Sequence, residues 1–87
     1  MMYRKKAVSV EARQVNLANL DQVADWCKGI VRRREDNFHP RIQIMTLEGV
    51  VTAQLGDWVI KGVMGEFYPC RDDIFQMTYE PADEKEV

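Results

Sequence analysis

The hydrophobic and polar positions of this chain change their period along its length, which predicts a mixture of strands and helices. Over residues 6–15 they alternate, with Val8, Val10 and Ala12 on one side and polar residues on the other. A period of two residues is typical of a strand with one buried face. Val15 breaks the alternation, so the strand is expected to end near Gln14.

A short helix is predicted to follow over residues 19–28. Its apolar residues recur at helical spacing and would form one stripe: Leu20, Val23, Ala24 and Cys27. Asn19 is the expected N-cap, and Gln22 three residues later completes a capping-box pattern. Trp26 flanks the stripe and is expected to cover the edge of the core. Gly29 is expected to end the helix in a left-handed conformation.

The middle of the chain predicts a short strand and then a hairpin. Residues 30–34 favour a short strand that runs into a polar loop. Residues 41–47 carry apolar side chains on both faces, which is typical of a central strand. Glu48-Gly49 is a two-residue turn signal, so residues 50–54 are expected to return beside the central strand.

A second hairpin is predicted over residues 58–69, with its turn at Met64-Gly65. Gly62 inside the first strand indicates a bulge or the close approach of another group. Pro69 cannot donate to a ladder, so the second strand is expected at a sheet edge. Residues 71–79 then predict a short helix, with two carboxylates in its first turn.

Together these elements predict a single α+β domain over residues 1–80, followed by an acidic tail over residues 81–87. We expect one curved antiparallel sheet of about five or six strands, half closed into a barrel. The first helix would lie across one face of that sheet, and the second would plug one end. A chain of 87 residues has room for one small core, which association into a homodimer would supplement.

Composition excludes several classes of function. The chain is 46% hydrophobic and 30% charged, as expected of a globular protein, and no apolar run approaches the ~20 residues of a membrane span. No secretory signal is visible at the N-terminus, so a cytoplasmic protein is expected. The formal net charge of −2 gives no overall attraction to phosphate, which makes nucleic acid an unfavoured partner.

Catalytic chemistry is not indicated, and we predict neither an enzyme nor a bound metal or cofactor. His39 is the single histidine, and no nucleophile–base–acid set can be assembled around it. Cys27 and Cys70 lack the close paired spacing of zinc or redox motifs. They are expected to be buried, although pairing in space stays open. Asp57 and Glu66 are expected at opposite ends of the second hairpin, as a turn residue and a cross-strand partner.

Two sets of residues are candidates for binding. The first is aromatic, because exposed tryptophan and tyrosine anchor protein interfaces: Trp58, Phe67, Tyr68 and Trp26. The alternative for these rings is packing against the last helix. The second set is basic and could contact phosphate: Lys28, Arg32, Arg33, Arg34 and Arg41. The alternative for these is a solvated loop and strand end.

The second hairpin also carries a resemblance to a known group of proteins. Its runs Gly56-Asp57-Trp58-Val59-Ile60 and Tyr68-Pro69-Cys70 resemble the C-terminal signature of a widespread set of small phage and prophage proteins, as do Asp73-Ile74-Phe75 and Thr78-Tyr79-Glu80-Pro81. The signature positions are Gly56, Asp57, Gly62, Gly65, Glu66, Cys70, Phe75 and Tyr79. Two positions depart from the usual pattern, with Leu55 and Asp72 standing where proline is common.

What the resemblance implies is limited. Members of that set are mostly of unassigned function, and they are encoded among the small non-structural genes of tailed phages. The resemblance implies a protein made inside an infected or lysogenic bacterium, and it brings no catalytic activity. Such accessory proteins commonly bind a host or phage protein. We therefore expect a non-enzymatic protein that acts by protein–protein binding, with a nucleic-acid-associated regulator as the alternative.

Overall fold

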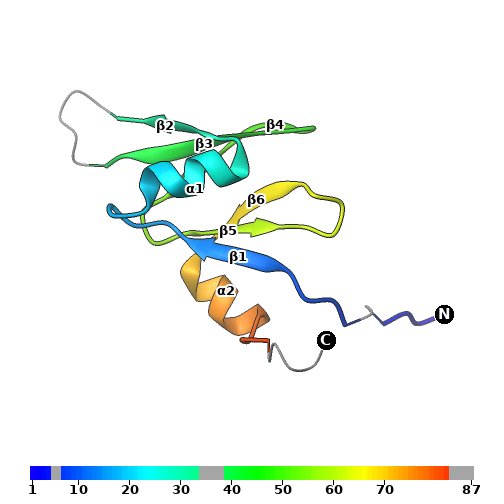
Figure 1. Ribbon diagram of the computed structural model, residues 1–87. Helices are drawn as coiled ribbons and strands as arrows, with labels where there is room; N and C mark the ends of the chain where they lie inside the picture. The colour runs from blue at the N-terminus through cyan, green and yellow to red at the C-terminus, as the bar shows by residue number, and fades with distance from the viewer. Residues whose placement is uncertain (5–6, 34–38, 83–87) are drawn as a thin grey trace.

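The computed structural model describes residues 1–4, 7–33 and 39–82. Figure 1 shows its elements, which follow the order β1 (Glu11–Gln14), α1 (Leu20–Cys27), β2 (Ile30–Arg32), β3 (Arg41–Thr46), β4 (Gly49–Gln54), β5 (Trp58–Lys61), β6 (Phe67–Cys70) and α2 (Asp72–Thr78). The predicted α+β class is confirmed. Of the predicted acidic tail, residues 83–87 lie outside the described part, as does residue 6 of the first predicted strand.

The six strands form two antiparallel sheets of three rather than the single curved sheet expected. We call them sheet A, with strand order β1-β5-β6, and sheet B, with order β2-β3-β4. The division occurs at the turn before β5. There Gly56 has a positive φ of 92°, and the Asp57 carboxylate accepts a hydrogen bond of 2.9 Å from the Gln54 backbone N–H. This turn takes the chain out of sheet B, and β5 pairs with β1 instead.

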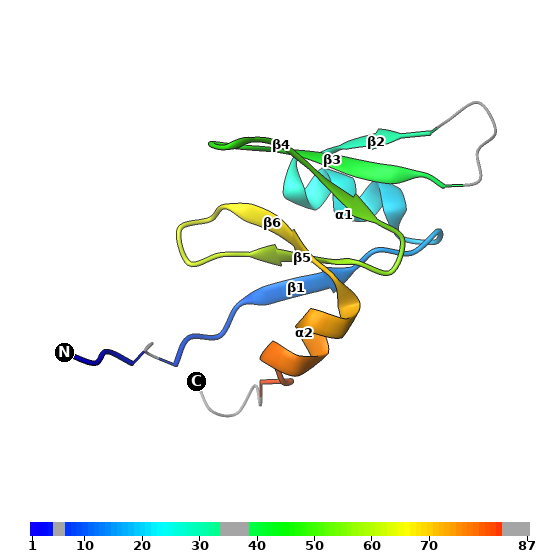
Figure 2. The ribbon, with the colours of Figure 1, turned by 180° about the vertical axis from the view of Figure 1, so that it is seen from behind.

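Helix α1 supplies much of the core between the two sheets (Figures 1 and 2). It contacts β2 and β3 of sheet B and β5 of sheet A. The predicted apolar stripe is confirmed, because all four of its residues are buried. The core cluster consists of Val15, Leu20, Val23, Ala24, Cys27, Ile42, Ile44, Ala53 and Val59. Since these residues come from both sheets and from α1, the described chain has one continuous main core.

Both predicted ends of α1 need correction. Asn19 precedes the helix, but its side chain makes no capping bond. Instead Asn16 and Asn19 each accept the other's backbone N–H, at 2.8 and 2.9 Å, so the expected capping box with Gln22 is wrong. At the other end Lys28, not Gly29, takes the left-handed conformation, with φ of 58°.

Gly29 is required for a different reason. A Cβ atom at this position would lie 2.6 Å from Cγ2 of Ile42 and 2.9 Å from the backbone oxygen of Gln43. These distances are shorter than van der Waals contact, and the second neighbour is backbone. Glycine therefore lets the end of α1 approach β3 closely, and Lys28 adopts the unfavourable φ in its place.

The two hairpins are confirmed, with small differences at their turns. Thr46 pairs with Gly49, so Leu47-Glu48 form the first turn and Gly49 already belongs to β4. In the second hairpin β5 ends at Lys61, and the Gly62 N–H donates to the Glu66 carbonyl at 2.7 Å. β6 is an edge strand of sheet A, as the proline at position 69 predicted.

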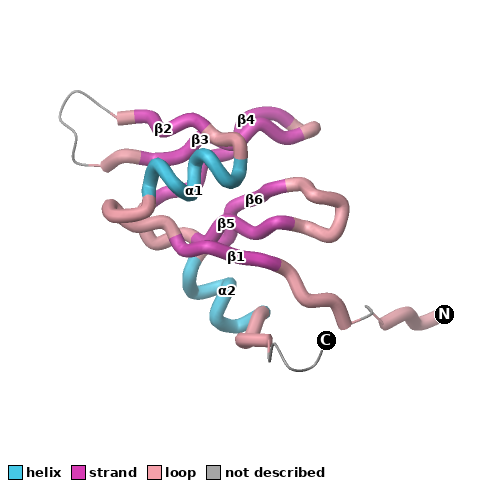
Figure 3. Tube along the Cα trace, in the orientation of Figure 1, coloured by secondary structure: helices cyan, strands magenta, loops and turns pink. Residues whose placement is uncertain are grey.

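Helix α2 covers the other face of sheet A, opposite α1 (Figure 3). Alternation along β5 turns Val59 toward the main core and Trp58 toward α2, where its ring stacks on Phe75. Ala12 of β1 and Tyr68 of β6 both pair with Ile60 of β5, so these residues share the Trp58 face of sheet A. Sheet A is thus sandwiched between the two helices. Sheet B has a helix on one face.

Candidate functional site

The face of sheet B that points away from α1 carries several exposed side chains at alternating strand positions. Because Ile42 and Ile44 of β3 are buried, their neighbours in the strand point outward. The strand register then assigns one outward set, which we call the outer face: Ile30, Arg32, Arg41, Gln43, Met45, Val50, Thr52 and Gln54. The outer face has an apolar end and a basic end.

The apolar end lies next to the turn between β3 and β4. Met45 pairs directly with Val50, and their side chains are 76% and 54% exposed. Ile30 pairs with Gln43, one step along the same face, and Leu47 lies in the adjoining turn. These four residues are large, apolar and accessible. Contiguous apolar surface of this kind marks an interaction site more often than isolated exposed residues do.

The basic end is formed by Arg32 and Arg41, which pair directly across β2 and β3. The Arg32 Nε donates to the Gln43 Oε1 at 3.0 Å, and neither arginine forms an ion pair with another described residue. Like charges placed opposite one another destabilise a ladder, so this end favours a bound anion or carboxylate.

Of the five predicted basic residues, the structure brings only Arg32 and Arg41 together on one face. Lys28 ends α1 and is exposed. Arg33 is exposed beyond the end of β2, which stops at Arg32. Arg34 lies outside the described residues. The predicted cluster is therefore a cross-strand pair with two separate cations nearby in the sequence.

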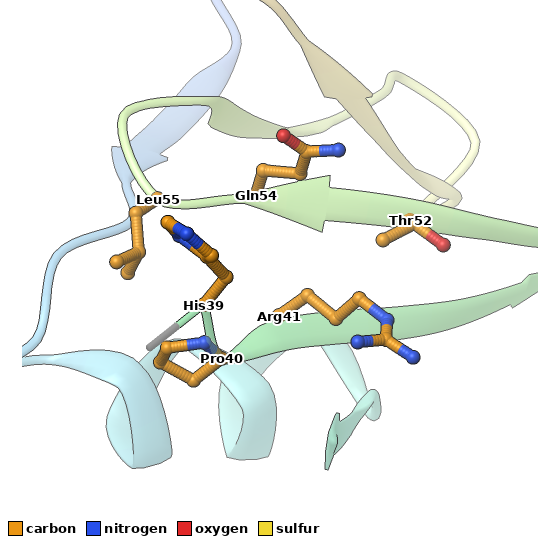
Figure 4. A pocket seen from close by; sticks show the side chains of 6 residues that line it. All are labelled: His39, Pro40, Arg41, Thr52, Gln54 and Leu55. Atoms are coloured by element: carbon orange, nitrogen blue, oxygen red, sulfur yellow. The ribbon is translucent and has the colours of Figure 1, made fainter. Parts of the chain in front are cut away.

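A hollow of about 600 Å³ adjoins the basic end (Figure 4). It is lined by His39, Pro40, Arg41, Thr52, Gln54 and Leu55. An imidazole, a guanidinium, a hydroxyl and an amide supply its polar groups, and none of the six residues is a carboxylate. This set can donate hydrogen bonds to an anionic or polar group but contains no nucleophile with an orienting acid.

The four predicted aromatic anchors are half-buried, and each one contacts another side chain of the same chain. The Trp26 and Phe67 rings meet edge to face, with centroids 5.0 Å apart. Trp58 stacks on Phe75 at 4.0 Å. Tyr68 forms a hydrogen bond with Tyr79 that, with burial, raises the pKa of Tyr68 to about 12. These four rings therefore pack largely against other side chains of the same chain.

The exposed residues of the apolar end were not predicted as a site, although the sequence held a signal for them. Apolar side chains occur on both faces of residues 41–47, which favoured a central strand. β3 is central in sheet B, as predicted, and α1 covers one of its faces while Met45 on the other is exposed. The second set of apolar side chains in this segment therefore includes residues of the exposed apolar end.

Other candidate groups stay apart. Cys27 is buried and Cys70 half-buried, and both are free thiols whose pKa is raised by burial. Asp57 is a turn residue, as predicted. The Glu66 side chain lies against Gly62 at the far end of the hairpin. Within the described residues, no three histidine, cysteine or acidic side chains gather closely enough to hold a metal ion.

No family model matches the chain, and comparisons with curated proteins and with solved structures find no similar protein. In the described part of the chain, neither helix is long and apolar enough to cross a membrane.

Proposed function

We propose that this protein is a non-enzymatic binding protein that holds a partner protein on the outer face of sheet B. The observation that supports this best is the directly paired Met45 and Val50, exposed on the back of strands whose other face forms the core. Complete burial of an exposed side chain of this size contributes roughly 1.5–3 kcal/mol, and the exposed parts of Met45 and Val50 would contribute a share of that.

The chemistry of the outer face defines the partner. Its apolar end suits an aliphatic or aromatic anchor, and its basic end suits a carboxylate about one strand length away. Arg32 is held in place by Gln43, so a bidentate carboxylate contact would lose little side-chain entropy. The proposed partner therefore presents an apolar patch beside an acidic one.

The resemblance of the second hairpin to small phage and prophage proteins supports a bacterial setting. On that basis the proposed partner is a host or phage protein met in the cytoplasm of an infected or lysogenic bacterium. The resemblance supports the bacterial setting, and the exposed residues of sheet B support the binding surface.

Capture from a bacterial lysate with matched variants tests the proposal. The double variant Met45→Thr, Val50→Thr keeps β-branched or strand-compatible side chains while removing apolar surface. Its control is Val63→Thr, Met64→Thr, which alters two similarly exposed apolar residues in the other hairpin. We expect a specific protein to be captured by the wild type and by the control, and captured at least about tenfold less by the outer-face variant.

Two results would count against the proposal. One is recovery of the same proteins by all three forms, which would indicate adhesion unrelated to the outer face. The other is that nothing is recovered above background from lysates of infected and uninfected cells. Where a protein is captured, direct titration of that purified protein with each variant would show whether its affinity for the outer-face variant is lower.

The paired arginines favour a second candidate, contact with nucleic acid. Arg32 and Arg41 could bridge neighbouring phosphates, and His39 and Gln54 border the same region. This function predicts binding to single- or double-stranded nucleic acid that weakens steeply between low and physiological salt. The variant Arg32→Gln, Arg41→Gln should lessen the salt slope. Absence of binding at low salt would eliminate this candidate.

A further inference from the structure

Strand β1 is an edge strand with one unpaired side. Among the described strands, its one partner in sheet A is β5. Val15 exchanges hydrogen bonds with the β5 side of the sheet, since its N–H donates to the Asp57 carbonyl at 2.8 Å and its carbonyl accepts from the Gly56 N–H at 2.9 Å. By alternation Arg13 and Glu11 also bond toward β5, so the N–H and C=O groups of Ala12 and Val10 point to the open edge.

The open edge ends at Gln14. Its carbonyl points the same way as that of Ala12, and it accepts a hydrogen bond of 2.7 Å from the Asn19 side chain. This contact confirms the direction of the alternating groups. It also limits the free edge that another strand could use, which runs from residue 10 to the N–H of Gln14, because the Gln14 carbonyl is already bonded.

The side chains of this short edge are complementary to themselves. Glu11 and Arg13 lie on one face of β1, on either side of Ala12, and are half-exposed. In one copy they form an ion pair with each other, with Arg13 Nη2 and Glu11 Oε2 3.1 Å apart. An exposed pair between residues two apart in a strand contributes little to stability. Arg13 also lies over the Trp26 ring, with its Cζ 4.4 Å from the ring centroid, but the side chains of Arg13 and Glu11 are still 43% and 52% exposed, so their charges can be reached by another chain.

We propose that the β1 edge binds a second copy of this chain, antiparallel and about a two-fold axis at Ala12. The two Ala12 residues would exchange both backbone hydrogen bonds. Glu11 of each copy would face Arg13 of the other in a non-hydrogen-bonded pair, where side chains are closest. Sheet A would continue across the axis into the sheet A of the second copy, as an isologous dimer.

Charge selects this register over its neighbours. Shifting the axis toward residue 11 would place Glu11 opposite Glu11 of the other copy. Shifting it toward residue 13 would place Arg13 opposite Arg13. Both arrangements set like charges face to face in a ladder, which is destabilising. The small side chain of Ala12 leaves room for the strands to meet at the axis.

A swap of charges tests both the partner and the register. Sedimentation equilibrium of the wild type should show the mass rising toward twice the monomer with concentration. Glu11→Arg alone and Arg13→Glu alone should each stay monomeric, because each strand then carries a single sign of charge. An equimolar mixture of these two variants should associate again, since every cross-strand pair becomes complementary. The double variant Glu11→Arg, Arg13→Glu should self-associate like the wild type.

A backbone variant gives an independent readout. Ala12→Pro removes an N–H that points to the open edge and leaves the bonds between β1 and β5 in place, so it should abolish association. Circular dichroism and Tm of each variant confirm that it is folded. If Ala12→Pro does not fold, the mixture of charge variants decides alone.

Three results would overturn the proposal. The wild type could remain monomeric up to about 1 mM, which corresponds to negligible affinity. The mixture of single-charge variants could fail to associate while each is folded. Association could also persist in all β1 variants and disappear in Met45→Thr, Val50→Thr, which would place the contact on sheet B. The last result would contradict the dimer through β1 but not the function proposed for the outer face, so the experiment distinguishes failure of one proposal from failure of the other.

Discussion

The Phe75 ring lies parallel to the Trp58 indole, with 4.0 Å between ring centroids and 8° between ring planes. The Trp58 Nε1 also donates to the Asp72 Oδ1 at 2.9 Å, one turn earlier on the same helix. Helix α2 contains no fully buried residue. A helix of seven residues is unstable alone, so these two contacts with Trp58 account for its position.

Replacing Phe75 by alanine should therefore loosen α2. We expect the free energy of unfolding to fall by about 2 kcal/mol, roughly half the loss for a fully buried phenylalanine, and Tm to fall by about 8–16 °C. Ile74→Ala in the same helix is the control, because that side chain is 47% exposed and should change stability by less than about 0.5 kcal/mol. Equal losses from both variants would contradict the role given to the stack.

Asp72 should make stability depend on acid pH. Hydrogen bonds from Trp58 and Gln76 lower its pKa below the ordinary value of 3.8, so folding favours the ionised form. The contribution is then complete above pH 3.8 and is lost as pH falls through the lower pKa of the folded state. Thermal melts should show Asp72→Asn less stable than wild type near neutral pH, with the difference closing in strong acid. Asp73→Asn controls for the shared helix dipole.

The Tyr68 hydroxyl should lose its proton at a higher pH than an ordinary tyrosine does. Its hydrogen bond with Tyr79, together with burial, raises its pKa to about 12, which disfavours the phenolate in the folded protein. The associated stability is present below pH 10 and is lost as pH rises toward 12. Absorbance titration of tyrosinate should show a final phase that Tyr68→Phe removes. Tyr79→Phe should move that phase to lower pH, and an unchanged phase would mean that the hydrogen bond is not its cause.

Substitutions at two adjacent positions at the end of α1 should change the free energy of unfolding in opposite directions. Gly29→Ala should destabilise the protein by about 1–3 kcal/mol, because the added methyl group meets Ile42 and the Gln43 backbone. Lys28→Gly should stabilise it by up to about 1 kcal/mol, because glycine adopts the left-handed conformation without strain. Chemical denaturation of both variants measures the pair. Stabilisation by Gly29→Ala would show that β3 can move away.

Much of the fold followed from short-range patterns. The stripe of α1, the two hairpins and α2 were all predictable, because each depends on the spacing of residues close together in the chain. The left-handed residue was misplaced by one position because the sequence shows where glycine occurs but not how near β3 passes. The same holds for Asn19, whose competing partner Asn16 also has a good capping side chain.

The arrangement of strands that are far apart in the chain was harder to predict from the sequence. The pairing of β1 with β5 joins residues 44 to 50 positions apart, so local spacing does not reveal it. The aromatic candidates were chosen for residue type, and only the fold shows that Trp58 and Phe67 meet Phe75 and Trp26. Conversely, the sequence does not distinguish Met45 and Val50 from other strand residues, and only the structure shows that they are exposed, on the face of sheet B away from α1.

The pairing of β1 with β5 has a consequence for how the chain is made. Residues 11–14 leave the ribosome first among the strands, but their partners at 58–61 follow almost fifty residues later. Sheet B and α1 are assembled from near neighbours and can form in the interval. β1 is therefore synthesised before the other strands but is among the last to pair, and until it pairs with β5 the hydrogen-bonding groups on both of its edges are open.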